Sequence, residues 1–382
     1  MKRAKVLSIK RLVGLCNRIE DPRRVWGNKR HELTTILIIA LLAIISGCES
    51  WEEIHDYGKM KRTWLRTFLP LPNGIPSEPT FRRVFARLAP EALEEVYRQW
   101  VWPYVGSCLN KQICVDGKTV CGVNRRSDAK LHMVSAWVRE DGIALGQIRT
   151  EEKSNEITAI PKLLASLDIQ GGVVSIDAMG CQRDIARGII AQEAQYLLAV
   201  KDNQPTLHEE IREYFQWARA DSIESKQLSV HSEVSYEHGR KTTWRVFATK
   251  DTVWFEDHSH WSALRTFACV ERTRTQNEKT STQTAYYISS LEAEASVFLD
   301  LTRGHWSVEN QLHWLLDVAF GEDVSLVHTA HAPQNLSLLR KMALALIRLD
   351  ASCKASVGRK RKMAAYDDDF ALAVLTLGGG SK

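Results

Sequence analysis

A short run that is apolar on both faces, Val173-Val174-Ser175-Ile176-Asp177, constrains the fold more than any other feature of the sequence. Such a run is typical of a strand that lies inside a sheet with helices packed on both sides. A helical pattern over residues 183–193, a further strand over residues 196–200 and a second helical pattern after Pro205 follow it. This alternation predicts an α/β domain.

Three β-rich segments precede this run, over residues 112–118, 131–138 and 143–150. The polar stretches between them have the composition of hairpin connections, so we expect the three segments to pair antiparallel. A helix that begins at Ser154 or Asn155 comes next, with an apolar stripe that ends at Leu167. Three antiparallel strands, helix, strand, helix, strand is the order of a ribonuclease H-like mixed sheet, and we predict that topology.

The changes of pattern along the chain predict five parts. They are a helical N-terminal domain that is a candidate for DNA binding (1–102), the first part of the ribonuclease H-like core (103–224), a β-rich insertion (225–292), the last helices of the core (293–350) and a basic then acidic C-terminal tail (351–382).

The apolar stretch from Leu33 to Gly47 was tested as a possible membrane span. It contains two threonines and a serine, and it is shorter than the roughly 20 residues that cross a bilayer. We therefore predict a buried helix of an all-α domain and no membrane contact. The eight cysteines form no C-x-x-C pair and several lie in apolar runs, which predicts buried thiols in a reducing compartment such as the cytoplasm.

Positive charge is concentrated at two places in a chain whose net charge is only +5. Residues 1–30 carry ten Lys or Arg and two acidic residues, a local excess of +8, and a second basic run covers residues 359–362. Each run is compatible with a solvated tail or with phosphate contacts, and the sequence leaves both open.

A basic amphipathic helix is expected over residues 77–88, after a Pro/Gly-rich turn. Four apolar side chains share one face by the i, i+3, i+4, i+7 rule, which leaves Arg82, Arg83 and Arg87 on other faces. A helix of this kind either reads DNA, as in helix-turn-helix proteins, or presents a solvated arginine face.

Two aspartates stand at the ends of predicted core strands, Asp116 after Ile113-Cys114-Val115 and Asp177 after Ile176. In the predicted topology these strands are neighbours, so the two carboxylates would lie close together at the strand ends where ligand sites gather. Like charges at such a distance repel unless a cation lies between them. Oxygen ligands without thiolates favour Mg²⁺ or Mn²⁺. Taken alone, Asp116 could instead cap a turn or form a salt bridge.

A third ligand is expected from the helix over residues 303–323. His305, Glu309 and His313 follow one another at i, i+4 and i+8 and share one stripe of this helix. A carboxylate from that stripe could complete a two-metal site for displacement at phosphorus. The same three residues could bind zinc, but the stripe lacks an H-E-x-x-H motif and a zinc site would leave the two aspartates unexplained. Two structural histidines at the core edge are a further alternative.

Several longer motifs occur together in this chain. They are RHELTTILIIALLAIISGCESWEEI, VDGKTV, SNEITAIPKLL, IDAMGCQ, VKDNQP, EHGRKTTWR and RGHWSVENQLHWLLDVAFGED. In this order, over the whole chain, they resemble the H-repeat-associated transposases found with Rhs elements, a group of the DDE insertion-sequence transposases.

The resemblance implies a ribonuclease H-like catalytic domain interrupted by a β insertion. It implies Mg²⁺-dependent hydrolysis of double-stranded DNA at the ends of the element, with Mn²⁺ able to substitute, followed by strand transfer into target DNA. By motif, the catalytic and metal-binding acids would be Asp116 of VDGK, Asp177 of IDAMG and Glu309 of HWSVEN. A homo-oligomer that pairs two ends, and a cytoplasmic protein that joins the nucleoid when bound, would also be expected.

The last helix departs from the Tyr, Arg, Glu, Lys signature of related insertion-sequence transposases. Thr302, His305 and Leu316 stand where that signature has Tyr, Arg and Lys. Glu322 or Asp323 is therefore the alternative third acid.

Further side chains are predicted to contact DNA. They are Lys118, Lys201, Asn203, Gln204, His238, Arg240, His305, Arg82 and Arg83. For Lys201 and Arg240 an ordinary surface charge is the alternative. Two other functions stay open, a catalytically inactive remnant that only binds DNA and a ribonuclease H-like structure-specific nuclease.

Overall fold

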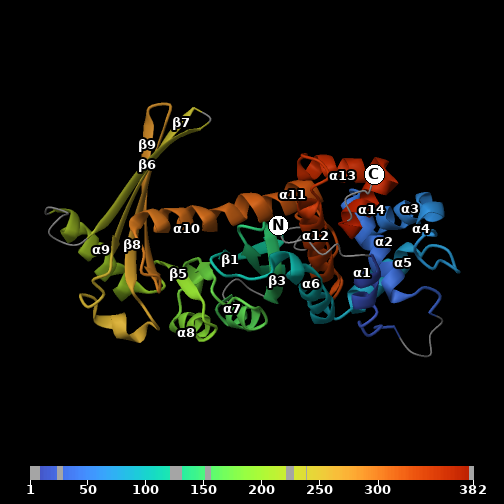
Figure 1. Cartoon of the computed structure of the whole chain (residues 1–382), viewed down its shortest axis with the longest axis horizontal. Helices are drawn as coiled ribbons and strands as arrows, with labels where there is room; N and C mark the ends of the chain where they lie inside the picture. Colours follow the sequence, from blue (N-terminus) through green and yellow to red (C-terminus); the bar gives the residue numbers. More distant parts are fainter. Residues whose placement is uncertain are drawn as a thin grey trace.

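The structure, a computed structural model, describes residues 9–23, 29–120, 131–150, 156–220, 228–237 and 239–377. Figure 1 shows an elongated molecule, with strands β6–β9 at one end and helices α1–α5 and α12–α14 at the other. Helices α10 and α11 run lengthwise between the two ends. The predicted starts of a helix at Ser154 or Asn155 lie outside the described residues.

One mixed sheet organises the middle of the chain and confirms the predicted mixed α/β fold. Its strands are β1 (Gln112–Val120), β2 (Leu131–Val138), β3 (Ile143–Thr150), β4 (Val173–Ile176), β5 (Gln195–Val200), β6 (Ser229–Glu237), β7 (Arg240–Thr249), β8 (Thr266–Gln276) and β9 (Lys279–Ser289). Within the described residues their spatial order is β3-β2-β1-β4-β5-β9-β8-β7-β6. Strands β1 to β3 pair antiparallel, whereas β1 with β4 and β4 with β5 pair parallel.

The predicted β-rich insertion does not form a separate sheet. Strand β9 pairs antiparallel with β5 from Leu197 opposite Ser289 to Val200 opposite Tyr286, so β6–β9 extend the central sheet. Unpaired edge strands expose backbone donors and acceptors, and β9 satisfies those of β5.

Helices cover both faces of the central strands. Helices α7 (Glu156–Ala165) and α8 (Arg183–Ala191) pack on one face, and α10 (Ala295–Val308) lies across the other, over β1 and β4. A short 3₁₀ turn, η3 (Ala178–Gly180), follows β4, and α9 (Pro205–Ala220) follows β5. A second 3₁₀ turn, η5 (Glu256–His260), lies between β7 and β8.

The N-terminal part is helical, as predicted. It comprises α1 (Ile9–Cys16), α2 (Leu33–Ile45), α3 (Trp51–Met60), α4 (Arg62–Leu65), α5 (Glu78–Arg87) and α6 (Pro90–Val105). Every residue of α2 is buried, because a helix that is apolar on all sides must be surrounded by protein. Among the described residues no helix is long and apolar enough to span a bilayer.

The C-terminal residues differ from the predicted tail. Residues of the predicted tail form α13 (Val357–Tyr366) and α14 (Asp368–Thr376). Both helices, like the preceding α12 (Ala332–Leu349), pack against α2. In the basic run, Lys360 forms an ion pair with Asp350 at 2.9 Å, and Arg361 donates to the Ile44 carbonyl at 2.9 Å. Both cations are buried by their own chain, so neither is presented as a solvated tail or as a phosphate contact.

Candidate metal centre

The register of the parallel strands brings Asp116 and Asp177 side by side where the pairing of β1 with β4 ends. Asp116 is not at the end of its own strand, as the sequence predicted, because β1 continues to Val120 in its pairing with β2. The last residue pair between β1 and β4 is Val115 with Ile176, and each aspartate is the next residue of its chain segment. Neighbouring strands lie about 4.8 Å apart and residues at equal register point to the same face. That face is the one that α10 covers.

Helix α10 lies across this face, and residues on successive turns of the helix bond to residues of β1 and β4. Gln112 donates from Nε2 to Ser175 Oγ at 2.9 Å and to the Leu301 carbonyl at 2.7 Å. His305 Nδ1 lies 3.1 Å from Ser175 Oγ. These bonds hold the helix in register with the strand ends, so its next turns reach the level of the aspartates.

The close approach of helix and sheet depends on a glycine. A Cβ at position 304 would overlap Gln112 Oε1 and would come within 2.6 Å of the Arg139 guanidinium. Arg139 is itself held in place by Asp300 through bonds of 2.7 and 2.8 Å. A side chain at position 304 would therefore force the Gln112 amide and the Arg139 guanidinium out of these positions.

A π-helical turn, Glu309–His313, joins α10 to α11 (Trp314–Phe320). The Trp314 N–H donates to the Glu309 carbonyl, five residues back. Such turns widen a helix locally and are frequent at functional sites. Here the turn directs Glu309 and His313 toward Asp116.

Three side chains meet at this point in a geometry that fits one metal ion. Ligand atoms of Asp116, Glu309 and His313 lie within 4.8 Å of one another, and His313 Nε2 is 3.1 Å from Asp116 Oδ2. It is the one such group found within the described part of the chain. His313 is buried, Asp116 is half-buried and Glu309 is exposed, so the centre opens toward solvent on the Glu309 side.

The surroundings of Asp116 favour its ionised form. Burial alone would raise the pKa of Asp116, but the hydrogen bond and charge of His313, the charge of His305 and the Gly117 N–H together lower it below the usual range. Burial lowers the pKa of His305, which Asp116 partly opposes. Carboxylate oxygens and an imidazole nitrogen are donors that suit a divalent cation.

Comparison with known proteins identifies the family. The Transposase DDE domain matches residues 110–346, and the domain described as DDE_Tnp_1-associated matches residues 15–101. The chain belongs to the DDE transposases.

Relatives within this family span nearly the whole chain. The chain is 37% identical over 380 residues to YncI of Escherichia coli O157:H7, a candidate transposase by name, covering 97% of this chain and 95% of the relative. It is 35% identical over 382 residues to YhhI of E. coli strain K12, named as an H repeat-associated candidate transposase, covering 98% and 100%. A solved piggyBac transposase synaptic complex with hairpin DNA aligns at 8% identity and a TM-score of 0.38 over 98% of this chain and 79% of that chain, too low a similarity to establish a shared fold.

In this DDE transposase chain, Asp177 has a local structural partner. Its Oδ1 accepts from the Met179 N–H at 3.1 Å and caps the turn η3. The strand register places Asp177 next to Asp116. Asp177 is not one of the three residues whose ligand atoms meet.

Two residues predicted to contact DNA hold the loop that follows Asp177. Asn203 donates from Nδ2 to the Ala178 carbonyl at 2.5 Å, and Gln204 donates from Nε2 to the Cys181 carbonyl at 2.9 Å. Both side chains tie the end of β5 to the end of β4. The sequence carried a signal for this, two amides directly after a buried strand, but it did not indicate their partners.

Lys118 lies two residues beyond Asp116 and is surrounded by acids. Its Nζ forms ion pairs with Asp317, with Glu322 at 3.2 Å and with Asp323 at 3.5 Å. Burial would raise the pKa of Glu322, but Lys118, Lys341 and Arg340 lower it to about 2. The alternative third acids thus balance Lys118, and neither belongs to the group around Asp116.

The other predicted DNA contacts are dispersed over the molecule. Lys201 is exposed directly after β5, Arg240 begins β7, and His238 lies outside the described residues. On α5, Arg82 pairs with Glu78 at 3.4 Å, whereas Arg83 donates to the Pro79 carbonyl at 3.0 Å. Of the described residues in this set, Lys201, Arg240, Arg82 and Arg83 do not belong to the metal centre.

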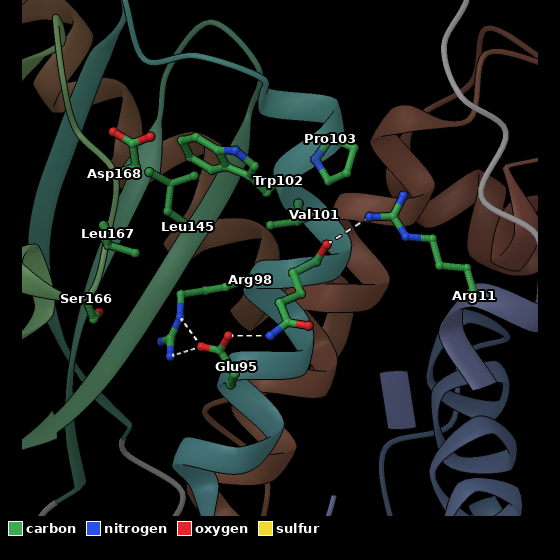
Figure 2. A pocket seen from close by; sticks show the side chains of 11 residues that line it. Arg11, Glu95, Arg98, Val101, Trp102, Pro103, Leu145, Ser166, Leu167 and Asp168 are labelled. Atoms are coloured by element: carbon green, nitrogen blue, oxygen red, sulfur yellow. Dashed lines mark hydrogen bonds and ion pairs between the residues drawn. The ribbon is translucent and has the colours of Figure 1, made fainter. Parts of the chain in front are cut away.

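A separate cavity of about 400 Å³ lies beside α6 (Figure 2). Arg11 donates to the Gln99 carbonyl at 3.2 Å across it, and Glu95 accepts from Arg98 at 2.8 Å and from Gln99 at 2.6 Å. Arg11, Glu95, Arg98 and Gln99 thus bond to one another, whereas Ser166 donates to the Leu163 carbonyl and Asp168 accepts from the Gln170 N–H. The cavity shares no residue with the metal centre.

Proposed function

We propose that this protein is an insertion-sequence transposase that cleaves double-stranded DNA at the ends of its element and transfers the cut strand into target DNA. The observation that carries the proposal is the meeting of Asp116, Glu309 and His313, with Asp177 at the neighbouring strand end, inside the region that matches the Transposase DDE domain. We further propose that the core is ribonuclease H-like. The strand order β3-β2-β1-β4-β5, with three antiparallel strands followed by two parallel ones, supports it.

Asp116, Asp177 and Glu309 are the proposed metal-holding acids, with His313 beside them. Mg²⁺ or Mn²⁺ bound by these residues would activate a water or a 3′-hydroxyl and stabilise the leaving oxygen of an in-line displacement. Asp116 is poised for this because its pKa is lowered and it is ionised at neutral pH. Exposed Glu309 leaves the centre open to a bulky phosphodiester substrate.

The protein chain itself orients the acids. Gln112 and Ser175 fix α10 against the strands, the π-helical turn places Glu309 beside Asp116, and Asn203 holds the loop after Asp177. Such positioning supplies catalytic advantage because the acids need no rearrangement when DNA arrives. Pairing of two ends by a homo-oligomer, in a cytoplasmic protein that joins the nucleoid, completes the proposal.

The test is cleavage of DNA that carries the inverted repeats flanking the gene, in Mg²⁺ or Mn²⁺. Glu309→Gln is expected to abolish cleavage and strand transfer while the protein keeps its stability and its DNA affinity, because the side chain is exposed. Full activity in this variant would overturn the assignment of Glu309. Cleavage by the parent protein without joined products would instead identify a structure-specific nuclease.

A DNA-binding remnant without catalytic activity is the second candidate. It is favoured by one relative, YbfQ of E. coli strain K12, which is named as an inactive transposase and matches 81 residues of this chain at 33% identity. If the parent protein, Asp116→Ala and Asp177→Ala all bind DNA equally and none cleaves it, the remnant is the better description.

A further inference from the structure

The helical N-terminal part contains a cavity of about 570 Å³ whose lining is strongly basic. Among the described residues, five cationic side chains contribute to it and no acidic side chain lines it. They are Arg23, Lys29, Arg30, Arg83 and Arg87. The first three come from the charged N-terminal region and the last two from α5, so distant parts of the sequence concentrate positive charge at one place.

Most of this charge is not neutralised. Arg23 pairs with Asp21 at 2.6 Å, and Lys29 is 3.6 Å from the same carboxylate. Within the described part of the chain, no ion pair is found for Arg30, Arg83 or Arg87, and all three are exposed. Arg83 and Arg87 are four residues apart on one helix stripe, a spacing at which like charges repel. An arrangement that costs free energy in the isolated protein is stabilised by an anion.

The cavity also offers neutral donors at the start of α5. The hydroxyl groups of Ser77 and Thr80 line it and hydrogen-bond each other at 3.0 Å, which leaves one of the two O–H groups to donate to a ligand. Asn73 donates to the Arg30 carbonyl at 2.6 Å and thereby holds the residue 29–31 segment against the turn before α5. Hydroxyl groups, helix N-termini and guanidinium groups are the donors that bind phosphate oxygens in protein–DNA complexes.

We infer that this cavity, the α5 basic groove, binds the phosphodiester backbone of duplex DNA without reading its sequence. The inference rests on the proposed function for its ligand, since the DNA held by a transposase is the polyanion that this charge fits. The groove does not share residues with the metal centre, so the two can be tested apart.

The structure also supplies a matched control on the same helix. Arg82 is adjacent to Arg83 in the sequence, but it lines a different cavity of about 490 Å³ together with Glu49, Glu52, Glu53 and Glu78. Its guanidinium pairs with Glu78 at 3.4 Å. Removal of Arg82 changes the net charge as removal of Arg83 does, but it leaves the α5 basic groove intact.

The experiment measures binding of a fluorescent random-sequence DNA duplex by anisotropy over a range of NaCl concentrations. All proteins are full-length, carry Asp116→Asn to prevent cleavage, and are assayed without divalent metal. The double variant Arg83→Ala, Arg87→Ala is expected to bind about 10-fold more weakly or worse, and to lower the slope of log K against log salt by about 2. Arg82→Ala is expected to leave affinity and slope unchanged. Thermal melting verifies that each variant is folded.

An unchanged salt slope in the folded double variant would overturn the inference. A decrease in slope of about 1 in Arg82→Ala would also overturn it, because one charge outside the groove would then act as strongly as each charge within it. If the double variant does not fold, Arg30→Gln replaces it, with an expected decrease in slope of about 1. If the protein without Asp116→Asn cleaves element ends but the double variant keeps its salt slope, the proposed function stands and the groove is refuted. If the double variant has a reduced salt slope but the protein without Asp116→Asn never cleaves element ends, the groove stands and the proposed cleavage is refuted.

Discussion

Replacement of Glu322 by glutamine separates its role from that of Glu309. Glu322 is 1% exposed and lies 3.2 Å from Lys118 Nζ, and the buried cations Arg340 and Lys341 also act on it. Glutamine has nearly the same shape but no charge. The variant therefore leaves buried cations without their balancing carboxylate.

The expected magnitude follows from the pKa. Burial would raise the pKa of Glu322, yet the three cations lower it from 4.5 to about 2, which corresponds to roughly 3 kcal/mol at neutral pH. Removing one partner of a buried charge pair costs about 3–5 kcal/mol. We expect Glu322→Gln to lower the free energy of unfolding at pH 7 by about 3–5 kcal/mol.

The effect should depend on pH in a defined direction. The pKa is lower in the folded state, so the stabilisation is fully present above 4.5 and is lost as the pH falls toward about 2. The difference between parent and variant should therefore shrink as the pH falls through this window.

Urea denaturation at pH 7 and at acidic pH, on parent, Glu322→Gln and Glu309→Gln, measures these differences. Glu309→Gln should unfold like the parent at both pH values, because Glu309 is exposed. A Glu322→Gln protein that is as stable as the parent at pH 7 would refute the electrostatic reasoning. If that stable protein had also lost cleavage, Glu322 would replace Glu309 as the third acid.

Three further substitutions test the support of the centre. Gly304→Ala should lower the free energy of unfolding by about 1–3 kcal/mol in urea titrations, because its Cβ overlaps Gln112. Asn203→Ala should slow cleavage of element ends without weakening DNA binding, since its bond to the Ala178 carbonyl holds the loop after the second aspartate; an equal loss of affinity would favour a DNA contact instead. His313→Gln should weaken Mn²⁺ binding, measured by calorimetry, by about 10-fold or more, and unchanged binding would remove the imidazole from the centre.

Local sequence patterns were sufficient for the strands and for the place of two acids. The run that ends at Asp177 and the segment that ends at Asp116 are strands of one sheet, side by side and parallel. The all-apolar helix α2 is buried as its composition required. Such features are predictable because the burial pattern of a segment follows from the order of its own apolar and polar residues.

Partners between distant segments could not be predicted in this way. Lys118 meets acids about 200 residues further along the chain, and Arg83 and its neighbour Arg82 face cavities of opposite charge. Strand β9 could have paired within its own hairpins alone, yet it also completes the edge of β5. The residue pattern reports that a face or an edge must be covered, whereas the covering segment is selected by shape and charge complementarity over the whole chain.

The metal centre combines both kinds of information. The sequence by itself indicated that two core strands carry Asp116 and Asp177 and that one helix carries a polar stripe, whereas the pairing with β2 continues β1 past Asp116 to Val120. Only the tertiary structure decided that the helix lies close enough, through Gly304, and that a π-helical turn brings His313 as well as Glu309 to Asp116. The helical periodicity of these residues does not indicate a π-helical turn, because the extra residue of the turn is stabilised by contacts made after the helix docks on the sheet.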